Sequence, residues 1–261
     1  MEPLFLHAGN PGPFTGDGNW TYFIDGPAPV LVDAGVGETA HLDAIGAAAG
    51  GRALKLVVTH AHSDHINGAP AIVERWPATV VSKLPWLVRD KDLRISPLGE
   101  GDVVTTGQGD LQVVHTPGHA PDHLCLWHAD SRTLFVGDMM QQGTTVMIPA
   151  SHGGSVVEYL ASLERLKRLN PKRALPAHGP VIEDPLALID YYVRHRAERE
   201  QQVLAALDAG LATVEAMVAR IYPDLKPALV PMARESVLAH LAKLEQERRA
   251  RRESDGWAAA D

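Results

Sequence analysis

Short apolar runs with the character of β-strands recur along the first two thirds of the chain. They are rich in Val, Leu or aromatic residues and are bounded by Gly, Pro or Asp, which commonly end strands. On this pattern we expect strands at 19–25, 29–35, 54–60, 78–82, 111–117, 123–129, 133–138, 144–148 and 173–179.

Helical patterns lie between some of these runs. Residues 155–169 carry an apolar side chain at every third or fourth position from Val156 to Leu169, which predicts an amphipathic helix. Asn170-Pro171 is expected to end this helix. Because helices are interspersed among consecutive strands, we expect an α+β chain whose sheets are covered by helices.

The pattern changes after about residue 185, where no run reads strongly as a strand. Asp184-Pro185 is a plausible start of a helix, and two further helical segments, 213–222 and 231–253, are separated by prolines. We therefore predict a larger domain over 1–190 and a small helical domain over 191–261.

Composition narrows the class of protein. The chain has 261 residues, 45% of them hydrophobic and 21% charged, as is typical of a soluble globular enzyme. It has no apolar run of the roughly 20 residues that span a bilayer, and no basic segment precedes an apolar one at the start. The single cysteine, Cys125, excludes an internal disulfide and suits a reducing compartment, so we expect a cytoplasmic protein without a membrane partner. The net charge of −8 weighs against broad nucleic-acid binding, and nothing signals an oligomer.

The distribution of histidines is the unusual feature. Three histidines and an aspartate follow one strand-like run in "THAHSDH", and other metal-capable residues follow four more such runs. A fold that gathers strand ends would bring these residues together. The metal-ligand candidates are His60, His62, Asp64, His65, His119, Asp138 and His178.

These seven side chains suit a centre of two divalent metal ions. Neutral imidazoles bind zinc, iron or manganese, and a carboxylate can bridge two ions. The candidate set contains no cysteine, which disfavours a structural zinc site. We expect two zinc ions, with iron or manganese as alternatives.

The motifs resemble those of the metallo-β-lactamase superfamily. "THAHSDH" matches its His-x-His-x-Asp-His signature, and "VDAG", "TPGH", "GD" and "PAHG" occur in the superfamily's order. The resemblance implies a four-layer αβ/βα sandwich with a dinuclear site. It also implies that His60, His62 and His119 bind one metal, that Asp64, His65 and His178 bind the other, and that Asp138 bridges them.

Both ends of the chain are similar to one group of this superfamily, the lactamase-β-like proteins, which include endoribonucleases. The opening "NPGPFTGDGNWTYFID" departs from the group's pattern at Asn19-Trp20-Thr21. The C-terminal portion resembles a small winged-helix domain, in which Asp255-Gly256 would form the turn of a short wing.

Three further residues are candidates for supporting the site. Asp33 is expected to support a ligand rather than bind a metal. His123 is expected to orient a ligand, to touch the substrate or to cap a strand. His152 lies on a Gly-rich loop and is a candidate for the substrate pocket.

The expected function is that of a metal-dependent hydrolase. A hydroxide bound to two metals would attack an ester, thioester, lactone or similar small substrate, with Asp64 and Asp138 as catalytic residues. One alternative is a phosphodiesterase that cleaves single-stranded RNA, for which the arginines between 248 and 252 are candidates. A second alternative is a non-hydrolytic binding protein on the same scaffold.

Overall fold

Two mixed β-sheets form the centre of the molecule in the computed structural model, which describes residues 1–90 and 93–260. Over these residues, the first sheet has the order β1-β2-β3-β4-β5-β6 and the second has the order β11-β10-β9-β8-β7. The strands of the first sheet are β1 (Leu4–His7), β2 (Trp20–Ile24), β3 (Val30–Val32), β4 (Lys55–Val57), β5 (Val80–Lys83) and β6 (Ile95–Pro97). Those of the second are β7 (Val103–Thr106), β8 (Gly109–His115), β9 (Leu124–His128), β10 (Thr133–Gly137) and β11 (Arg173–Pro176).

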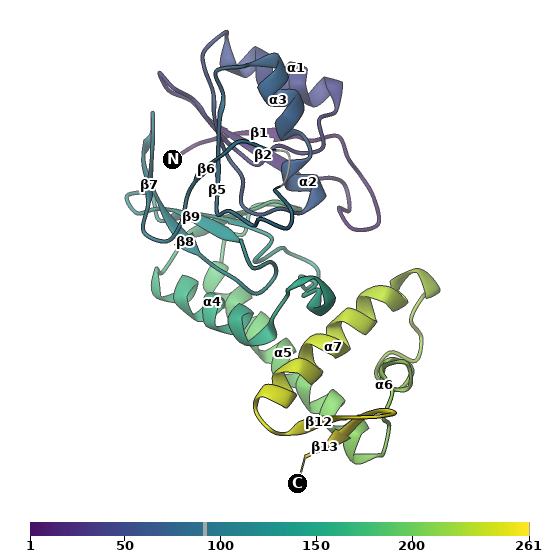
Figure 1. Cartoon of the computed structure of the whole chain (residues 1–261). Coiled ribbons are helices and arrows are strands. Elements are labelled where there is room, and N and C mark those ends of the chain that lie inside the picture. The colour runs from purple at the N-terminus through teal and green to yellow at the C-terminus, as the bar shows by residue number, and fades with distance from the viewer. Residues whose placement is uncertain (91–92, 261) are drawn as a thin grey trace.

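Helices cover the outer face of each sheet, which gives four layers (Figure 1). Those beside the first sheet are α1 (Thr39–Ala49), α2 (Ser63–Ile66) and α3 (Ala69–Arg75), and those beside the second are α4 (Val156–Arg168) and α5 (Pro185–Asp208). The alternation of side chains along β3 explains the layering. Val30 and Val32 pack in the core between the sheets, whereas Leu31 packs against α1 and α3. The α+β expectation is confirmed.

The C-terminal part has a hydrophobic core of its own. It contains α6 (Val214–Ile221), the short helix η2 (Pro227–Leu229), α7 (Val230–Gln246) and a hairpin of β12 (Ala250–Glu253) and β13 (Gly256–Ala259). Val203 and Leu207 from the end of α5 pack in this core with Met217, Leu241 and Trp257. Helix α5 therefore runs without a break across residues 190–191, and the division into 1–190 and 191–261 stays a prediction.

The strand expected at 144–148 is wrong. This segment is irregular, and its carbonyl groups accept hydrogen bonds from side chains instead of a neighbouring strand. The carbonyl of Thr144 accepts from the Tyr192 hydroxyl at 3.0 Å, and that of Met147 faces His119 Nδ1 at 2.7 Å. The alternating apolar pattern of the segment reflects burial without a sheet partner.

The end of the chain also differs from expectation. Helix α7 stops at Gln246, not at residue 253, and Arg248 adopts a positive φ of 59° that is incompatible with a continuing helix. The strands β12 and β13 were not expected as strands, although a wing was. Because Glu253 pairs with Gly256, the turn of this wing is Ser254-Asp255, one residue earlier than expected.

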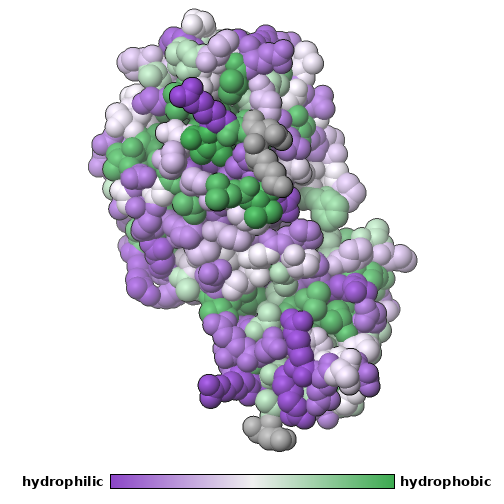
Figure 2. Space-filling model, viewed as in Figure 1, coloured by the Kyte–Doolittle hydropathy of each residue, from purple (hydrophilic) through white to green (hydrophobic). Residues whose placement is uncertain are grey.

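On the surface, the molecule consists of a larger upper body and a smaller C-terminal part below it (Figure 2). Helix α7 joins the two parts by packing on α4, α5 and the short helix η1 (Ala150–His152). Among the residues that the structure describes, no helix combines the length and apolar character needed to cross a membrane.

Candidate metal centre

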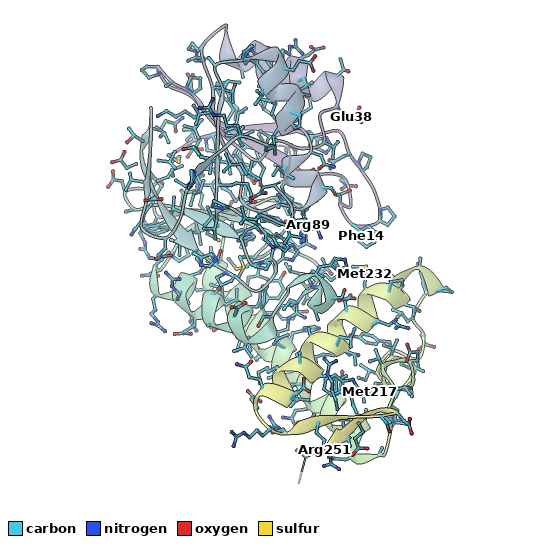
Figure 3. The ribbon with its side chains drawn as sticks, viewed as in Figure 1. Phe14, Glu38, Arg89, Met217, Met232 and Arg251 are labelled. Atoms are coloured by element: carbon cyan, nitrogen blue, oxygen red, sulfur yellow. The ribbon has the colours of Figure 1, made fainter. Side chains whose placement is uncertain are left out.

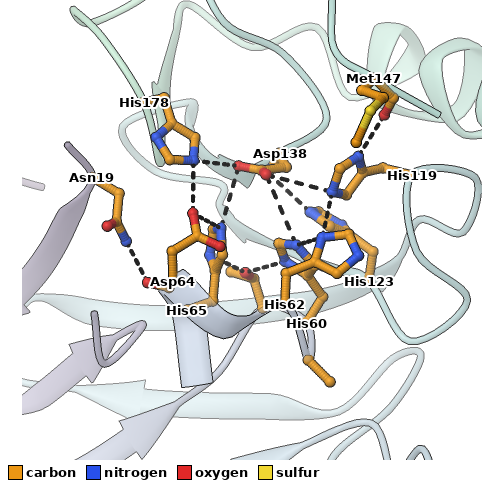
Figure 4. A network of polar contacts seen from close by, with 12 residues as sticks. Asn19, His60, His62, Asp64, His65, His119, His123, Asp138, Met147 and His178 are labelled. Carbon is orange, nitrogen blue, oxygen red and sulfur yellow. Dashed lines mark hydrogen bonds and ion pairs between the residues drawn. The ribbon is translucent and has the colours of Figure 1, made fainter. Parts of the chain in front are cut away.

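The sheets bring the candidate ligands to one edge. Strands β3 and β4 are parallel, as are β10 and β11, so their carboxyl ends point the same way within each pair. Asp33 and His60 follow the first pair, and Asp138 and His178 follow the second. His119 lies in the loop between β8 and β9. All seven candidate ligands converge there, in two adjoining groups (Figure 4).

The first group consists of His60, His62, His119 and Asp138. The Nδ1 atom of His62 lies 2.9 Å from His60 Nε2 and 2.8 Å from His119 Nε2. One oxygen of Asp138, Oδ2, lies 3.4 Å from His119 Nε2 and 3.9 Å from His60 Nε2. Three imidazole nitrogens and a carboxylate oxygen therefore face a common point.

The second group consists of Asp64, His65 and His178, with Asp138 again beside it. Oδ2 of Asp64 lies 3.2 Å from His178 Nε2 and 3.5 Å from His65 Nε2. The other oxygen of Asp138, Oδ1, lies 3.4 Å from His178 Nε2 and 3.5 Å from His65 Nε2. Asp138 thus turns one oxygen toward each group, as a bridging carboxylate does.

The donor set fits two metal ions. Ligands about 2.0 to 2.2 Å from a tetrahedral ion are separated by about 3.4 Å, and most of the distances above lie near that value. The three nitrogens of the first group would need to move apart by about 0.5 Å. Nε2 of His65 and Oδ1 of Asp138 are buried and have no hydrogen-bond partner among the described residues, an arrangement that a cation between them would satisfy.

Hydrogen bonds fix which nitrogen each histidine presents to the centre. The Nδ1 atoms of four histidines face oxygen acceptors, which leaves the Nε2 lone pairs for the metals. These contacts are His60 with Thr59 Oγ1 at 3.0 Å, His65 with Asp33 Oδ2 at 2.8 Å, His119 with the Met147 carbonyl at 2.7 Å and His178 with the Gly18 carbonyl at 3.4 Å.

Burial keeps the histidines of the first group neutral. Burial, followed by the neighbouring His119, lowers the pKa of His62 to about 3. The pKa of His60 is also held well below its usual value, first by burial and then by His65. In the second group burial would lower the pKa of His65, but the carboxylates of Asp138, Asp33 and Asp64 outweigh it and raise that pKa. This excess of negative charge matches a site for cations.

Asp33 contacts the second group through His65. Its Oδ1 accepts the Thr59 backbone N–H at 2.7 Å, and its Oδ2 accepts the Thr59 hydroxyl at 3.0 Å and faces His65 Nδ1. The residue adopts a positive φ of 66°, which aspartate tolerates better than most side chains. Asp33 thus contacts His65 through the Nδ1 atom of that histidine, and its supporting role stays a prediction.

His123 is fully buried behind the first group. Its Nε2 accepts the backbone N–H of Asp138 at 3.1 Å, so its Nδ1 carries the proton and donates to the Thr116 hydroxyl at 2.8 Å. Gly137 makes room for this contact, because a Cβ there would lie 2.6 Å from His123 Nε2. His123 therefore contacts the backbone of Asp138, which suits the orienting role, and that role stays a prediction.

A buried ion cluster holds the loop that carries the first ligands. Lys83 is fully buried, and its Nζ lies 2.9 Å from Asp90 Oδ2 and 3.0 Å from Asp122 Oδ2. The same oxygen of Asp122 accepts the N–H of Ala61, between His60 and His62, at 2.9 Å. Sequence reasoning missed this cluster, and also Asn19, whose Nδ2 donates to the Asp64 carbonyl at 2.7 Å. The departure of Asn19-Trp20-Thr21 from the family pattern was the one signal at that position.

The metal centre opens into a pocket of about 790 Å³, which we call the main pocket. Figure 3 shows three of its residues, Phe14, Arg89 and Met232, around the place where the upper body meets α7. His152 lines this pocket, as considered from the sequence, and Leu229 adds a second residue from the C-terminal part. Phe14 is 70% exposed, so the mouth of the pocket offers apolar surface to a ligand.

Comparisons with known proteins agree with this geometry. Residues 14–178 match the family model of the metallo-beta-lactamase superfamily, and residues 213–257 match that of the beta-lactamase associated winged helix domain. The fold is similar to that of a metallo-beta-lactamase family protein from Thermus thermophilus. The TM-score is 0.81 over 98% of each chain, at 20% identity.

Two curated relatives match most of the chain. The beta-lactamase-like protein 2 homolog of Drosophila melanogaster is 33% identical over 257 residues, which cover 91% of this chain and 86% of the relative. An atrochrysone carboxyl ACP thioesterase of Aspergillus chevalieri is 31% identical over 252 residues, which cover 88% of this chain and 78% of the relative. The chain therefore belongs to the metallo-beta-lactamase superfamily, as a hydrolase with an associated winged helix domain.

Proposed function

We propose that the protein hydrolyses a small acyl substrate, namely a thioester, an ester or a lactone, and that thioesters are its preferred class. The observation that carries this proposal is the position of seven converging metal ligands in a large pocket with apolar walls. The similarity to a protein named as a thioesterase favours thioesters within this class.

The pocket suits an acyl group. Val36, Val146 and Met147 line it near the ligands, and Phe14 and Met232 line it as well. Burying an apolar chain against these side chains contributes about 0.8 kcal/mol for each CH₂ group. The polar centre and the apolar walls together would hold a carbonyl at the metals and its chain along the walls.

Two divalent metals, zinc first and iron or manganese as alternatives, would polarise the carbonyl and lower the pKa of water to about 7. His60, His62 and His119 would bind one of them, Asp64, His65 and His178 the other, and Asp138 both. Asp64 has a second task, because its side chain is 18% exposed to the pocket and can accept a hydrogen bond from the attacking water. Asp64 would thereby orient that water toward the carbonyl.

Cleavage of RNA is the weaker alternative. Three of the four arginines near the C-terminus face carboxylates of the same chain: Arg249 faces Glu200 at 2.9 Å, Arg251 faces Glu253 at 3.0 Å and Arg252 faces Glu245 at 3.5 Å. Charges balanced in this way attract a phosphate backbone less than free ones.

A substrate panel with defined metals tests the proposal. Metal-free protein would be reloaded with zinc, iron(II) or manganese(II) and given an acyl thioester, naphthyl acetate, a lactone, bis-(4-nitrophenyl) phosphate and single-stranded RNA. We expect the thioester to have the highest kcat/KM, and Asp138→Ala to lower it by about 10³-fold. Asp43→Ala, at an exposed position on α1, is the matched control.

Full activity of metal-free protein would contradict a metal-dependent reaction. Efficient cleavage of RNA with no acyl hydrolysis would replace the proposal with the phosphodiesterase alternative. Binding of an acyl thioester without turnover under every metal would favour a non-hydrolytic role.

A further inference from the structure

A second cavity adjoins the main pocket. It has a volume of about 240 Å³ and lies between the segment 144–147, α5 and the C-terminal part, and we call it the side pocket. The two cavities share a wall formed by Thr144, Thr145, Val146, Met147, Leu229 and Met232. The side pocket is therefore directly adjacent to the cavity that contains the metal centre.

The polar lining of the side pocket is basic. Three residues on one side of α5 line it, namely His195, Arg196 and Arg199. Among the residues that the structure describes, no Asp or Glu lines it. Neither arginine has a carboxylate within ion-pairing distance in the described ranges 1–90 and 93–260. The buried Glu200 of the same helix is occupied elsewhere, by Lys243 at 2.6 Å and Arg249 at 2.9 Å.

Both arginines keep unused hydrogen-bond donors. Arg196 is only 3% exposed; one terminal nitrogen donates to the Val146 carbonyl, but its buried Nε has no acceptor among the described residues. The Nε atom of Arg199 is also buried and has no acceptor among the described residues. The guanidinium group of Arg199 stacks 4.2 Å from the centre of the Tyr222 ring. Burying the Arg196 guanidinium group with a free donor is costly unless an anion pairs with it, and the partly buried Arg199 places a second cation beside it.

The neighbouring histidines add no positive charge to that of the two arginines. Burial, followed by the charge of Arg196, lowers the pKa of His195 and takes that of His240 to about 3, so both are neutral at pH 7. Among the described lining residues, the side pocket therefore holds two positive charges and no negative one.

We propose that the side pocket binds a phosphate group carried by the substrate at the end remote from the bond that is cleaved. This inference rests on the proposed acyl hydrolysis. Two guanidinium groups with free donors match the several oxygens and the charge of a phosphate. Arg196 donates to the carbonyl of Val146, and His119 faces the carbonyl of the next residue, Met147, so the same segment of chain contacts the proposed phosphate site and a candidate metal ligand.

A pair of probes that differ only in a phosphate group tests this assignment. The probes are an S-acyl pantetheine and the same thioester with a 4′-phosphate. For direct binding, pantetheine and pantetheine 4′-phosphate would be titrated into metal-loaded protein by calorimetry. We expect the phosphate group to tighten binding and to lower KM by at least about 10-fold, because it adds charge-assisted hydrogen bonds to the arginines.

Variants on one helix locate the effect. Arg199→Gln is expected to abolish the preference for the phosphorylated probe, and Arg196→Lys, which retains a charge beside the segment 144–147, to reduce it. Arg194→Gln is the matched control, because Arg194 is exposed on the same helix and lines neither cavity. Circular dichroism spectra would confirm that each variant is folded.

The outcomes separate this inference from the proposed function. A preference for pantetheine 4′-phosphate that Arg199→Gln removes supports the phosphate site even if no thioester is cleaved. Equal binding and equal KM for both probes, unchanged in Arg199→Gln, would overturn it. Tight binding of inorganic phosphate with no advantage for the phosphorylated substrate would also overturn it, because the site would then serve a free ion.

Discussion

At the scale of single residues, the centre depends on the orientation of its histidines as much as on their number. The sequence identified seven candidate ligands because they follow strand-like runs in a recognisable order, and the structure brings all seven together. It could not identify Thr59, Asp122 or Asn19 as supports. Asn19 reaches Asp64, and Thr59 reaches Asp33, only because the fold brings them together, and the local spacing of residues does not reveal such contacts.

Asp33→Asn tests the importance of this support. Asparagine retains the shape of Asp33 and tolerates its positive φ, but it removes the negative charge next to His65. We expect the affinity for one metal to fall about 10- to 100-fold, while the metal held by His60, His62 and His119 is less affected. Competition with a chromophoric chelator measures both affinities.

Asp43→Asn on exposed α1 is the control for Asp33→Asn. Equal loss of both metals, or loss of neither, would contradict a role specific to the group that contains His65.

At the scale of elements, regular segments were predictable where their apolar side chains face a core at regular intervals along the whole segment. Strand β9 and helix α4 follow their patterns closely, because each packs against neighbours along its whole length. The edge strands β1, β6 and β7 were not predicted, since several of their residues are exposed and the apolar alternation is weak. The segment 144–148 was misread because side chains of α5 and His119 satisfy its backbone in place of a strand.

The buried Lys83, at the end of β5, pairs with Asp90 and Asp122 from two separate loops. Removal of its charge should therefore destabilise the fold. Lys83→Met leaves Asp90 and Asp122 buried without a cation, which we expect to lower the free energy of unfolding by about 3 to 5 kcal/mol. Urea unfolding of metal-free protein measures this loss without a contribution from metal binding.

The double variant Lys83→Met/Asp122→Asn should recover part of the lost stability, because one unpaired charge is gone. Lys172→Met, at an exposed position, is the control. A loss below about 1 kcal/mol in the single variant would show that water reaches the cluster and replaces the lysine.

At the scale of the whole molecule, the C-terminal part completes the pocket. Leu229 and Met232 line it, and Glu235 holds η1 by accepting hydrogen bonds from the Ser151 backbone at 2.9 Å and its hydroxyl at 2.7 Å. The sequence predicted a separate helical domain and offered its arginines as candidates for RNA binding, but it did not place this domain at the pocket. Its packing on α4, α5 and η1 could not be derived from local patterns.

Met232→Ala tests this contribution to substrate choice. We expect it to raise KM about 10-fold for a long-chain acyl thioester and much less for an acetyl thioester, because only the longer chain would reach Met232. Metal content should not change. Val193→Ala, on an exposed position of α5, is the control, and equal effects on both substrates would contradict an acyl-binding role for Met232.

The single cysteine has a practical consequence. Cys125 is completely buried, and this burial raises the pKa of its thiol to about 12, so the native chain presents no reactive thiolate to a maleimide. A cysteine introduced at the exposed Phe14, or at Val193 for comparison, would be the one site that accepts a fluorophore. The molecule is thus already suited to site-specific labelling, and movement at the mouth of the main pocket could be followed by fluorescence without first removing a native thiol.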